Sequence, residues 1–544
     1  MIINRFFWWI ILLLFLLVVA LSLDLPMVVN AAKYAQVSRE IVESGDWINL
    51  TIAGDPYDQK PPLLFWIGAV FFQLFGVSAA VWKIAVILAS LGGIYSTYQL
   101  GRLLYDELTG RFAALFWAVS LGYLYFHNDI HTDTLLADTV IFSIWQLASY
   151  FKGKKPVHFY LGMAGIGLSM LAKGPVGLAI PAFAVGIHLA LHRKWKEIFH
   201  PRWLTGAVVV FIMIIPALAG LFNQFGPEGI KFYFWTNNMG RITGSYAGKN
   251  SDPFFYIHTS LYMLAPFTVF ALSGLGRTIG KVFSSWKKFP AHDEFYTLGG
   301  ILPYLLILSV AKAKNPHYLI AVIPLLMILA AAFTMALASA KTSSTTRKTV
   351  SFLNVFITCL LWVIIAVFGL WLFPEMKFMV WAGIAIIAGL LYYFWRNYRG
   401  ISRQIAILAL SMMAFMFSLN ASIYPRMVQY HSPVHALKDY NEQSAQGEEI
   451  HCYLPPSRYW EIFFYASNPG RYYVTEEELP QLLNEKKDWV FTDENGKNQI
   501  IGRNPDTIIA GEYDHSSLSK ITLPFLIPST RAGKLQKRYL LHLP

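Results

Sequence analysis

Residues 54–66 read Gly-Asp-Pro-Tyr-Asp-Gln-Lys-Pro-Pro-Leu-Leu-Phe-Trp. This polar, proline-rich stretch lies between a first apolar run, residues 6–23, and a long series of further apolar runs. Apolar runs of about 17–25 residues joined by short basic loops are typical of helices that cross a membrane. The stretch therefore predicts a polar site at one surface of a polytopic membrane protein.

The composition supports this class. Hydrophobic residues make up 55% of the 544 residues and charged residues only 14%, whereas soluble domains carry about 25% charged residues. The net charge of +12 does not indicate a nucleic-acid partner, because Lys and Arg gather in the cytoplasmic loops of membrane proteins. Cys359 and Cys452 match no metal-ligand pattern. No small-residue cleavage site follows the first apolar run, so we expect an uncleaved first span.

The basic loops decide whether residues 62–75 cross the membrane. If they do not, later spans are expected at residues 80–104, 109–126, 134–151, 157–172, 175–192, 203–222, 254–274, 295–311, 316–339, 350–373, 378–395 and 403–423. The basic clusters then share one side with Arg5, and that side is cytoplasmic by the positive-inside rule. These clusters are Arg102/Arg111, Lys152/Lys154/Lys155, Arg193/Lys194/Lys196/Arg202, Lys281/Lys287/Lys288, Lys341/Arg347/Lys348 and Arg396/Arg399/Arg403.

This arrangement predicts a mainly α-helical protein with about 13 transmembrane helices. Residues 24–79 form an external loop with surface helices, in which the apolar part after Lys60 is re-entrant or interfacial. After about residue 424 the sequence becomes polar with short apolar runs. We therefore expect a transmembrane domain over residues 1–425 and a small soluble α/β domain over residues 426–544 on the same external face.

Several external residues could carry chemistry. Asp129 and Asp133 are four residues apart and would share a helix face. They suit either an acid/base or metal-binding pair, or a solvated helix N-terminus where Asp is favoured. Lys60 could hold a phosphate as a point charge, or be a plain interfacial lysine. Lys173, in a tight turn between two spans, is interpreted as a lysine that snorkels to the interface.

Two further cationic segments lie on the same predicted face. Arg241 follows an aromatic run, residues 233–235, which by itself is also typical of a membrane-interface aromatic belt. Lys312 and Lys314 make residues 312–318 basic although external, contrary to the positive-inside preference. Three cationic loops on one external face suggest a site for a lipid-linked phosphate or pyrophosphate.

The order of these motifs resembles that of GT-C type membrane glycosyltransferases, specifically the branch of bacterial lipid A aminoarabinose transferases and protein O-mannosyltransferases. The resemblance covers most of residues 1–425 and implies a GT-C fold. Its carriers are residues 30–47 (the family's Asp-Glu-x-Arg-Tyr and Gly-Asp-Trp segment), 57–66 (Tyr-x-Glu-Lys-Pro), Thr132-Asp133 (the second external acid), Ala172-Lys173-Gly174 (Thr-Lys-Gly), 234–241 (Phe-Trp to Arg) and 309–318 (Ser-x-x-Lys-x-Lys-Leu-Pro-x-Tyr).

The family transfers a sugar from a polyprenyl-phosphate carrier to an acceptor on the external side. The resemblance implies that Lys60 and Arg241 hold the carrier phosphate and that Asp133 is the leading acid or base. Asp129 and Asp58 are kept in reserve, and Asn30 occupies the position of the first family acid. The remaining substrate-binding candidates are Tyr34, Tyr57, Lys312, Lys314 and Tyr318.

The chain departs from the family pattern at three positions. Asn30 replaces an acid, and an amide cannot act as a base; Asp24, six residues away, is an alternative. Gln59 and Asn238 replace a Glu and a His that bind a metal in some members, and both are poor zinc ligands. We therefore expect no metal and no other cofactor, with a divalent metal kept as the alternative.

The leading hypothesis is a glycosyltransferase of a bacterial inner membrane whose site and C-terminal domain face the periplasm. Its partners would be a polyprenyl-phosphate-linked sugar donor, membrane lipids and an acceptor that is lipid A or another envelope lipid, a glycan or a protein hydroxyl. A transporter or flippase for lipid-linked sugars is the alternative from another class. Because the polar residues collect at one face, and not in broken mid-membrane helices, the enzyme is favoured. A catalytically weakened relative is a third reading.

Overall fold

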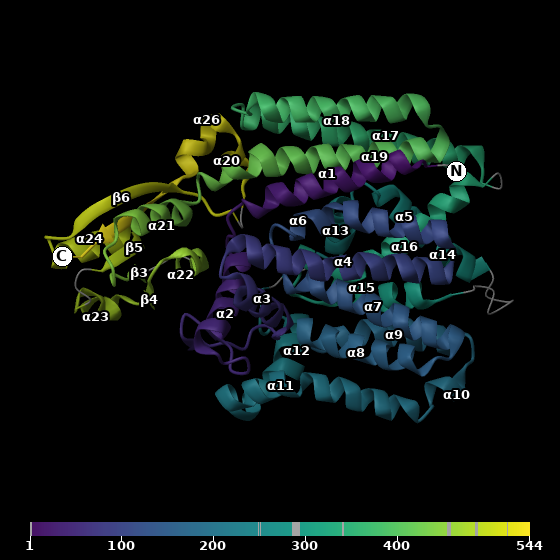
Figure 1. Ribbon diagram of the computed structural model, residues 1–544, viewed down its shortest axis with the longest axis horizontal. Coiled ribbons are helices and arrows are strands. Elements are labelled where there is room, and N and C mark those ends of the chain that lie inside the picture. The colour runs from purple at the N-terminus through teal and green to yellow at the C-terminus, as the bar shows by residue number, and fades with distance from the viewer. Residues whose placement is uncertain are drawn as a thin grey trace.

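The computed structural model describes residues 3–248, 250, 252–284, 294–339, 342–453, 458–484, 488–518 and 521–543. Long helices lie side by side in an elongated body, and a small sheet with its own helices lies at one end (Figure 1). The N-terminus lies at the opposite end of the body from the sheet. The predicted class, a mainly helical membrane protein with a small α/β part near the C-terminus, is confirmed.

Helices occupy every segment predicted to span the membrane. Within the described residues, eight helical segments are long and apolar enough to cross a bilayer. The helices of the body that match single predicted spans are α1 (Arg5–Leu23), α4 (Ala79–Leu104), α7 (Thr132–Gly153), α8 (Pro156–Lys173), α9 (Val176–Leu191), α11 (Arg202–Lys231), α15 (Tyr296–Val310), η3 with α16 (Pro316–Val322 and Ile323–Ala338), α17 with η4 (Ser344–Val367 and Phe368–Leu372), α18 (Phe378–Asn397) and α19 (Gly400–Ser418).

Two predicted spans are each broken into two helices. Residues 109–126 fall in α5 (Glu107–Val119) and α6 (Leu121–Phe126), and the Ser120 side chain between them accepts a hydrogen bond from the Tyr123 amide. Residues 254–274 fall in α13 (Phe255–Met263) and α14 (Thr268–Ser284). Pro266 lies at that break, where its missing amide proton cannot continue a helix.

The apolar helix that follows Lys60 is short. This helix, α3, covers Leu63–Phe75, 13 residues, whereas a spanning helix needs about 20. It buries Leu64 and Phe65 completely and leaves Leu74 and Phe75 about two-thirds exposed. It packs on α2 (Asn30–Ser44), and both helices lie at the end of the body nearest the sheet (Figure 1). This placement agrees with an interfacial segment.

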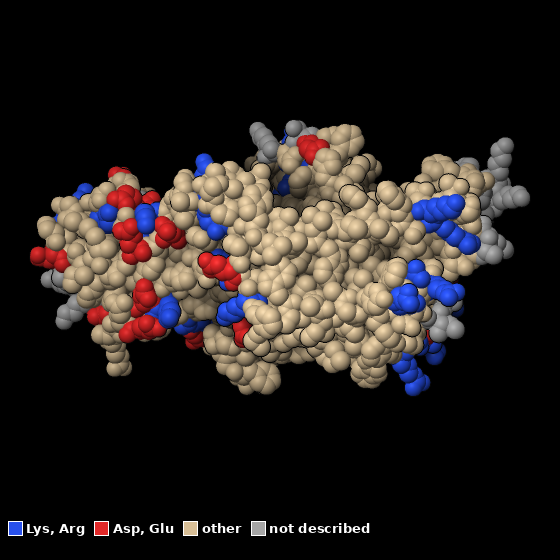
Figure 2. Space-filling model, turned by 90° about the horizontal axis from the view of Figure 1, so that it is seen from above, with Lys and Arg blue, Asp and Glu red and all other residues tan. Residues whose placement is uncertain are grey.

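Charge is unevenly distributed over the surface. Lys and Arg gather at the end of the body away from the sheet, whereas Asp and Glu gather mainly over the sheet end (Figure 2). The middle is apolar, and outer helices expose large side chains such as Leu13 of α1 and Phe352 of α17, as lipid contact requires. Of the predicted basic clusters, Lys287, Lys288 and Lys341 lie outside the described residues.

The C-terminal part is a five-stranded sheet with helices on both faces. The strand order is β4-β3-β5-β7-β6, with parallel pairs β3–β4 and β3–β5 and antiparallel pairs β5–β7 and β7–β6. One apolar core lies under α21 (Ser432–Gln443) and α22 (Trp460–Tyr465), and the other under α23 (Leu479–Asn484) and α24 (Glu494–Arg503). The strands are β3 (Ile450–Tyr453), β4 (Pro469–Tyr473), β5 (Trp489–Asp493), β6 (Ile508–His515) and β7 (Gln536–His542).

Candidate functional site

The segment from Tyr57 to Lys60 is held in place by a small hairpin. Strands β1 (Thr51–Ile52) and β2 (Asp55–Pro56) pair through a turn in which Ala53 and Gly54 have positive φ of 53° and 80°, a conformation that closes two-residue hairpins. Glu40 of α2 accepts hydrogen bonds from the Ala53 amide and the Thr51 hydroxyl, both at 2.6 Å. The hairpin is thereby fixed to α2, and the residues that follow it have a defined position.

Asp133 and Lys173 form a buried ion pair. Asp133 lies in the first turn of α7 with a side chain 1% exposed, and Lys173 ends α8 with a side chain 14% exposed. The ammonium of Lys173 donates a hydrogen bond to the Asp133 carboxylate. The interpretation of Lys173 as a lysine that snorkels to the interface is therefore wrong. Its turn continues at Gly174, with φ of 74°, and the side chain points inward to Asp133.

Tyr318 connects this pair to Arg241. The Lys173 Nζ lies 4.1 Å from the centroid of the Tyr318 ring, a distance typical of cation–π contacts. Arg241, in α12 (Asn237–Thr243), donates from Nη1 to the Tyr318 hydroxyl at 2.9 Å and from Nε to Asn237 Oδ1 at 2.8 Å. The guanidinium is thus held by neutral partners, which leave its positive charge uncompensated.

Lys60 lies beside these cations in a pocket against α11. The backbone of residues 48–50 approaches α11 at Gly220, where a Cβ would lie 2.0 Å from the Ile48 carbonyl oxygen. Burial lowers the pKa of Lys60 to about 7, the charges of Lys173 and Arg241 add to this effect, and Asp133 opposes it. We call Lys60, Lys173, Arg241 and Asp133 the inner group. With three cationic side chains around one carboxylate, it suits an anion.

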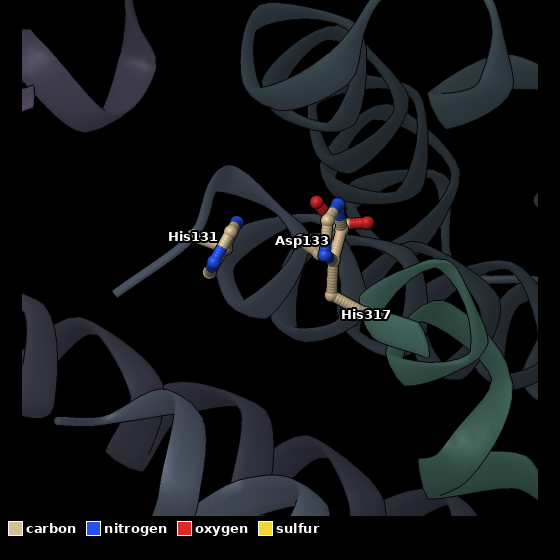
Figure 3. Close-up of side chains that lie close together, drawn as sticks. All are labelled: His131, Asp133 and His317. Carbon is tan, nitrogen blue, oxygen red and sulfur yellow. The ribbon is translucent and has the colours of Figure 1, made fainter. Parts of the chain in front are cut away.

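Two histidines lie next to Asp133. His131 precedes α7 and His317 belongs to η3 (Figure 3). Their rings stack at 4.3 Å, and ligand atoms of His131, Asp133 and His317 lie within 4.8 Å of one another. By residue type these could hold a divalent metal. However, Lys173 already pairs with Asp133, and the positive charges of Lys60 and Arg241 oppose a second cation.

Four other predicted residues surround the inner group. Tyr34 of α2 is buried against Phe65, with ring centroids 5.7 Å apart, and burial together with the charges of Asp133 and Asp129 raises its pKa. Tyr57 is buried against the same Phe65 ring at 5.7 Å. Asp129 Oδ2 lies 3.3 Å from His131 Nε2. Asn30 is half-buried at the first position of α2.

The structure does not bring Lys312 and Lys314 into the inner group. The Lys312 side chain is exposed, and Lys314 Nζ donates to the Asn250 carbonyl at 3.2 Å. Their backbone has a different role, because the amides of Lys312 and Ala313 donate to the carbonyls of Ile242 and Arg241 at 3.1 and 2.9 Å. The loop therefore positions α12, and the sequence prediction placed its cations too close to the phosphate site.

Gln59 and Asn238, which replace possible metal ligands, are engaged elsewhere. The Gln59 Oε1 accepts from Lys33 Nζ at 2.7 Å, and Asn238 Nδ2 donates to the Tyr233 carbonyl at 3.0 Å. Lys33 was not among the predicted site residues, although it lies in the motif of residues 30–47. Neither were His131, Lys173 and His317, whose signal was their position inside matched motifs.

Comparison with known proteins gives a family match over part of the chain. Residues 59–219 match the family described as dolichyl-phosphate-mannose-protein mannosyltransferase. Two relatives named undecaprenyl phosphate-alpha-4-amino-4-deoxy-L-arabinose arabinosyl transferase come from Edwardsiella ictaluri and Yersinia enterocolitica. They are 28% and 26% identical over 311 and 310 residues, which is 55% of this chain and 54% of each relative. The chain thus matches about half the length of these relatives.

The fold is shared over nearly the whole chain. The crystal structure of ArnT from Cupriavidus metallidurans bound to undecaprenyl phosphate matches with a TM-score of 0.75 at 14% identity, covering 98% of this chain and 97% of that one. The same protein in the apo state gives a TM-score of 0.73. The predicted resemblance to GT-C membrane glycosyltransferases is confirmed, and the chain is a multi-pass protein of a bacterial inner membrane.

Proposed function

We propose that this chain transfers a sugar from a polyprenyl-phosphate carrier to a lipid A-like or other phosphate-bearing envelope lipid at the periplasmic face of the inner membrane. The observation that carries the proposal is the inner group, in which Lys60, Lys173 and Arg241 surround Asp133. It lies at the end of the body where α2 and α3 pack. The names of the relatives support the donor class.

Lys60 and Arg241 bind the carrier phosphate in this proposal. The phosphate is the leaving group, so its negative charge grows as the bond to the sugar breaks. Cations that are already fixed in place stabilise that charge without reorganisation. Arg241 is oriented by Asn237 and Tyr318, and Lys60 lies in the pocket against α11. The polyprenyl chain would leave this pocket along the apolar outer surface of the helices.

Asp133 is the proposed acid or base, or the charge that stabilises a developing positive sugar. Its pairing with Lys173 favours the ionised carboxylate. Asp129 next to His131 is the second acidic candidate. Asn30 cannot act as a base, and this favours an acceptor that needs none. A phosphate oxygen is already ionised near neutral pH, whereas a protein or glycan hydroxyl would have to lose a proton.

We further propose that no metal takes part, since Lys173 pairs with the one carboxylate of the possible metal cluster. The orientation follows from the basic end of the body, which the positive-inside rule makes cytoplasmic. The site and the C-terminal domain, at the other end, would then be periplasmic. A lipid-linked sugar transporter would need a polar path through the body, whereas the described cationic site residues gather at one end.

The test is transfer by the purified full-length protein in lipid vesicles. Undecaprenyl-phosphate sugars serve as donors, lipid A as acceptor, and mass spectrometry detects the product. Envelope lipids from cells with and without the gene identify the natural sugar in parallel. We expect a lipid product with one added sugar. Translocation of the donor across vesicles without any glycosylated product would instead support the transporter.

A further inference from the structure

A second pocket lies on the other side of residues Tyr57–Gln59 from Lys60. It has a volume of about 310 Å³ and is lined by residues of the hairpin, of α2 and of the C-terminal domain. Tyr57 and Asp58 line both this pocket and the one beside Lys60. The two pockets are therefore neighbours separated by one short segment. We call the second one the outer pocket; the lining residues used below are Lys33, Tyr57, Asp58, Gln59, Arg458 and Trp460.

The C-terminal domain is docked firmly where it forms the wall of this pocket. Arg39 of α2 donates from Nη1 to the carbonyl oxygens of Phe463 and Phe464 at 3.3 and 3.1 Å. The backbone that enters α2 is bound as well, because the Val29 amide donates to buried Glu461 at 2.5 Å and the Met27 amide to the Tyr465 hydroxyl at 2.7 Å. Helix α22 is therefore a fixed neighbour of the helix that carries Lys33.

The outer pocket brings two cations together over an aromatic ring. Lys33 Nζ lies 5.6 Å and the Arg458 guanidinium carbon 5.7 Å from the centroid of the Trp460 ring. Lys33 Nζ also lies 5.1 Å from the centroid of the Tyr57 ring. Burial lowers the pKa of Lys33 to about 8, and the charge of Arg458 lowers it further while Asp58 opposes this. The pairing of like charges has a cost that an anion between them would remove.

Arg458 is available for such an anion. Within the described residues its guanidinium makes no hydrogen bond or ion pair with a carboxylate, and its side chain is exposed. Lys33 donates one hydrogen bond, to Gln59 Oε1, and an ammonium has three protons to give. A planar guanidinium can bind phosphate through two parallel hydrogen bonds. The aromatic face of Trp460 beside it suits the apolar face of a sugar ring.

We propose that the outer pocket binds the phosphate-bearing sugar headgroup of the acceptor lipid, and that Arg458 and Trp460 of the C-terminal domain complete this subsite with Lys33 of α2. This inference rests on the proposed function and adds a task for the C-terminal domain. The domain supplies one wall of the acceptor site, across Tyr57–Gln59 from the carrier phosphate site. The acceptor would therefore meet the donor at the segment that both pockets share.

The experiment measures binding to the purified full-length protein in detergent. The probes are diphosphoryl lipid A, the same lipid after removal of its phosphates, and undecaprenyl phosphate. Thermophoresis gives the Kd of the two lipid A forms, and thermal stabilisation reports binding of undecaprenyl phosphate. The variants are Arg458→Gln, Lys33→Gln and Arg458→Lys. Arg471→Gln is the matched control, because Arg471 is an exposed arginine of β4 in the same domain.

We expect Arg458→Gln and Lys33→Gln each to raise the Kd of diphosphoryl lipid A about five- to tenfold, as loss of a charged hydrogen-bond partner does. Arg458→Lys should recover part of the affinity, and Arg471→Gln should change nothing. Affinity for the dephosphorylated lipid should be the same in all variants. Stabilisation by undecaprenyl phosphate should also be unchanged, since the carrier phosphate binds at Lys60 and Arg241.

Two results would overturn the inference. One is an unchanged Kd for diphosphoryl lipid A in both Gln variants. The other is loss of undecaprenyl phosphate stabilisation in Arg458→Gln, which would assign the pocket to the donor. Failure of the proposed function has a different signature, namely a wild-type protein that neither binds undecaprenyl phosphate nor transfers sugar. Phosphate-dependent lipid A binding that depends on Arg458 would support the pocket even then.

Discussion

The inner group and the outer pocket are two cationic sites on either side of residues Tyr57–Gln59, and they differ in how their charges are satisfied. In the inner group, Lys173 pairs with Asp133 and Arg241 is held by Tyr318 and Asn237. In the outer pocket, Lys33 has one hydrogen bond and the side chain of Arg458 is exposed. A site in which every group is fixed suits chemistry at a reacting centre. A more open site suits recognition of a headgroup that must arrive and leave.

The largest effect that separates the two sites is expected at Asp133. Asp133→Asn should reduce transfer about a thousandfold, the size typical of a lost acid, base or charge at the reacting centre. Binding of undecaprenyl phosphate should persist, because an amide adds no negative charge. The measurement is kcat in vesicles together with thermal stabilisation by undecaprenyl phosphate. Asp129→Asn is the companion variant, and a larger loss there would move the catalytic assignment to Asp129.

Removal of the phosphate-binding cations should have the next largest effect. Lys60→Ala and Arg241→Ala should each lower kcat/KM about a hundredfold, because a cation opposite the leaving phosphate stabilises the transition state. Undecaprenyl phosphate should also bind more weakly to both. Lys377→Ala and Arg471→Ala are matched controls, since both side chains are exposed. Equal, small losses in all four variants would show that the inner group does not contact the carrier.

These expectations depend on contacts that the sequence could predict only in part. The apolar runs predicted the spans, and the basic loops predicted that the helix after Lys60 is interfacial; α3 has the expected short length. Motif order predicted that Lys60, Asp133, Arg241 and Tyr318 lie together. Each of these rests on local hydrophobicity or on a matched motif. The breaks at Ser120 and near Pro266 were not predicted, because periodicity does not reveal where a helix yields to packing.

What the sequence did not reveal are side-chain pairs between distant segments. Lys173 looked like an interfacial lysine because its partner Asp133 lies 40 residues earlier in the chain. His131 and His317 stack although they come from α7 and η3. Arg458 and Lys33 meet only because α22 docks on α2. Pattern and composition describe one segment at a time, so contacts of this kind follow from the tertiary fold.

Lys60 also predicts a dependence on pH that Arg241 does not share. Because the Lys60 pKa is about 7 in the free protein, its ammonium is lost as the pH rises above 7. A bound phosphate favours the charged form and raises that pKa, so binding takes up a proton. Affinity for undecaprenyl phosphate should therefore fall between pH 7.5 and 9, by at most about tenfold per pH unit. The phosphate itself is already fully ionised in this range.

Lys60→Arg provides the control, because a guanidinium stays charged throughout this range. The variant should bind undecaprenyl phosphate with an affinity that is nearly independent of pH between 7.5 and 9. Titration of the wild type and the variant by thermal stabilisation at several pH values gives the two slopes. Parallel slopes would assign the proton to another group and remove Lys60 from the phosphate site.

The smallest expected effect is that of metal removal. His131, Asp133 and His317 have the residue types of a metal site, but the ammonium of Lys173 pairs with Asp133. Lys60 and Arg241 add positive charge around it, and a divalent ion would have to overcome that repulsion. Transfer after dialysis against EDTA should therefore stay within about a factor of two of the untreated protein. Loss of transfer that zinc restores, and that His131→Ala and His317→Ala reproduce, would mean that a metal replaces Lys173 as the partner of Asp133 during turnover.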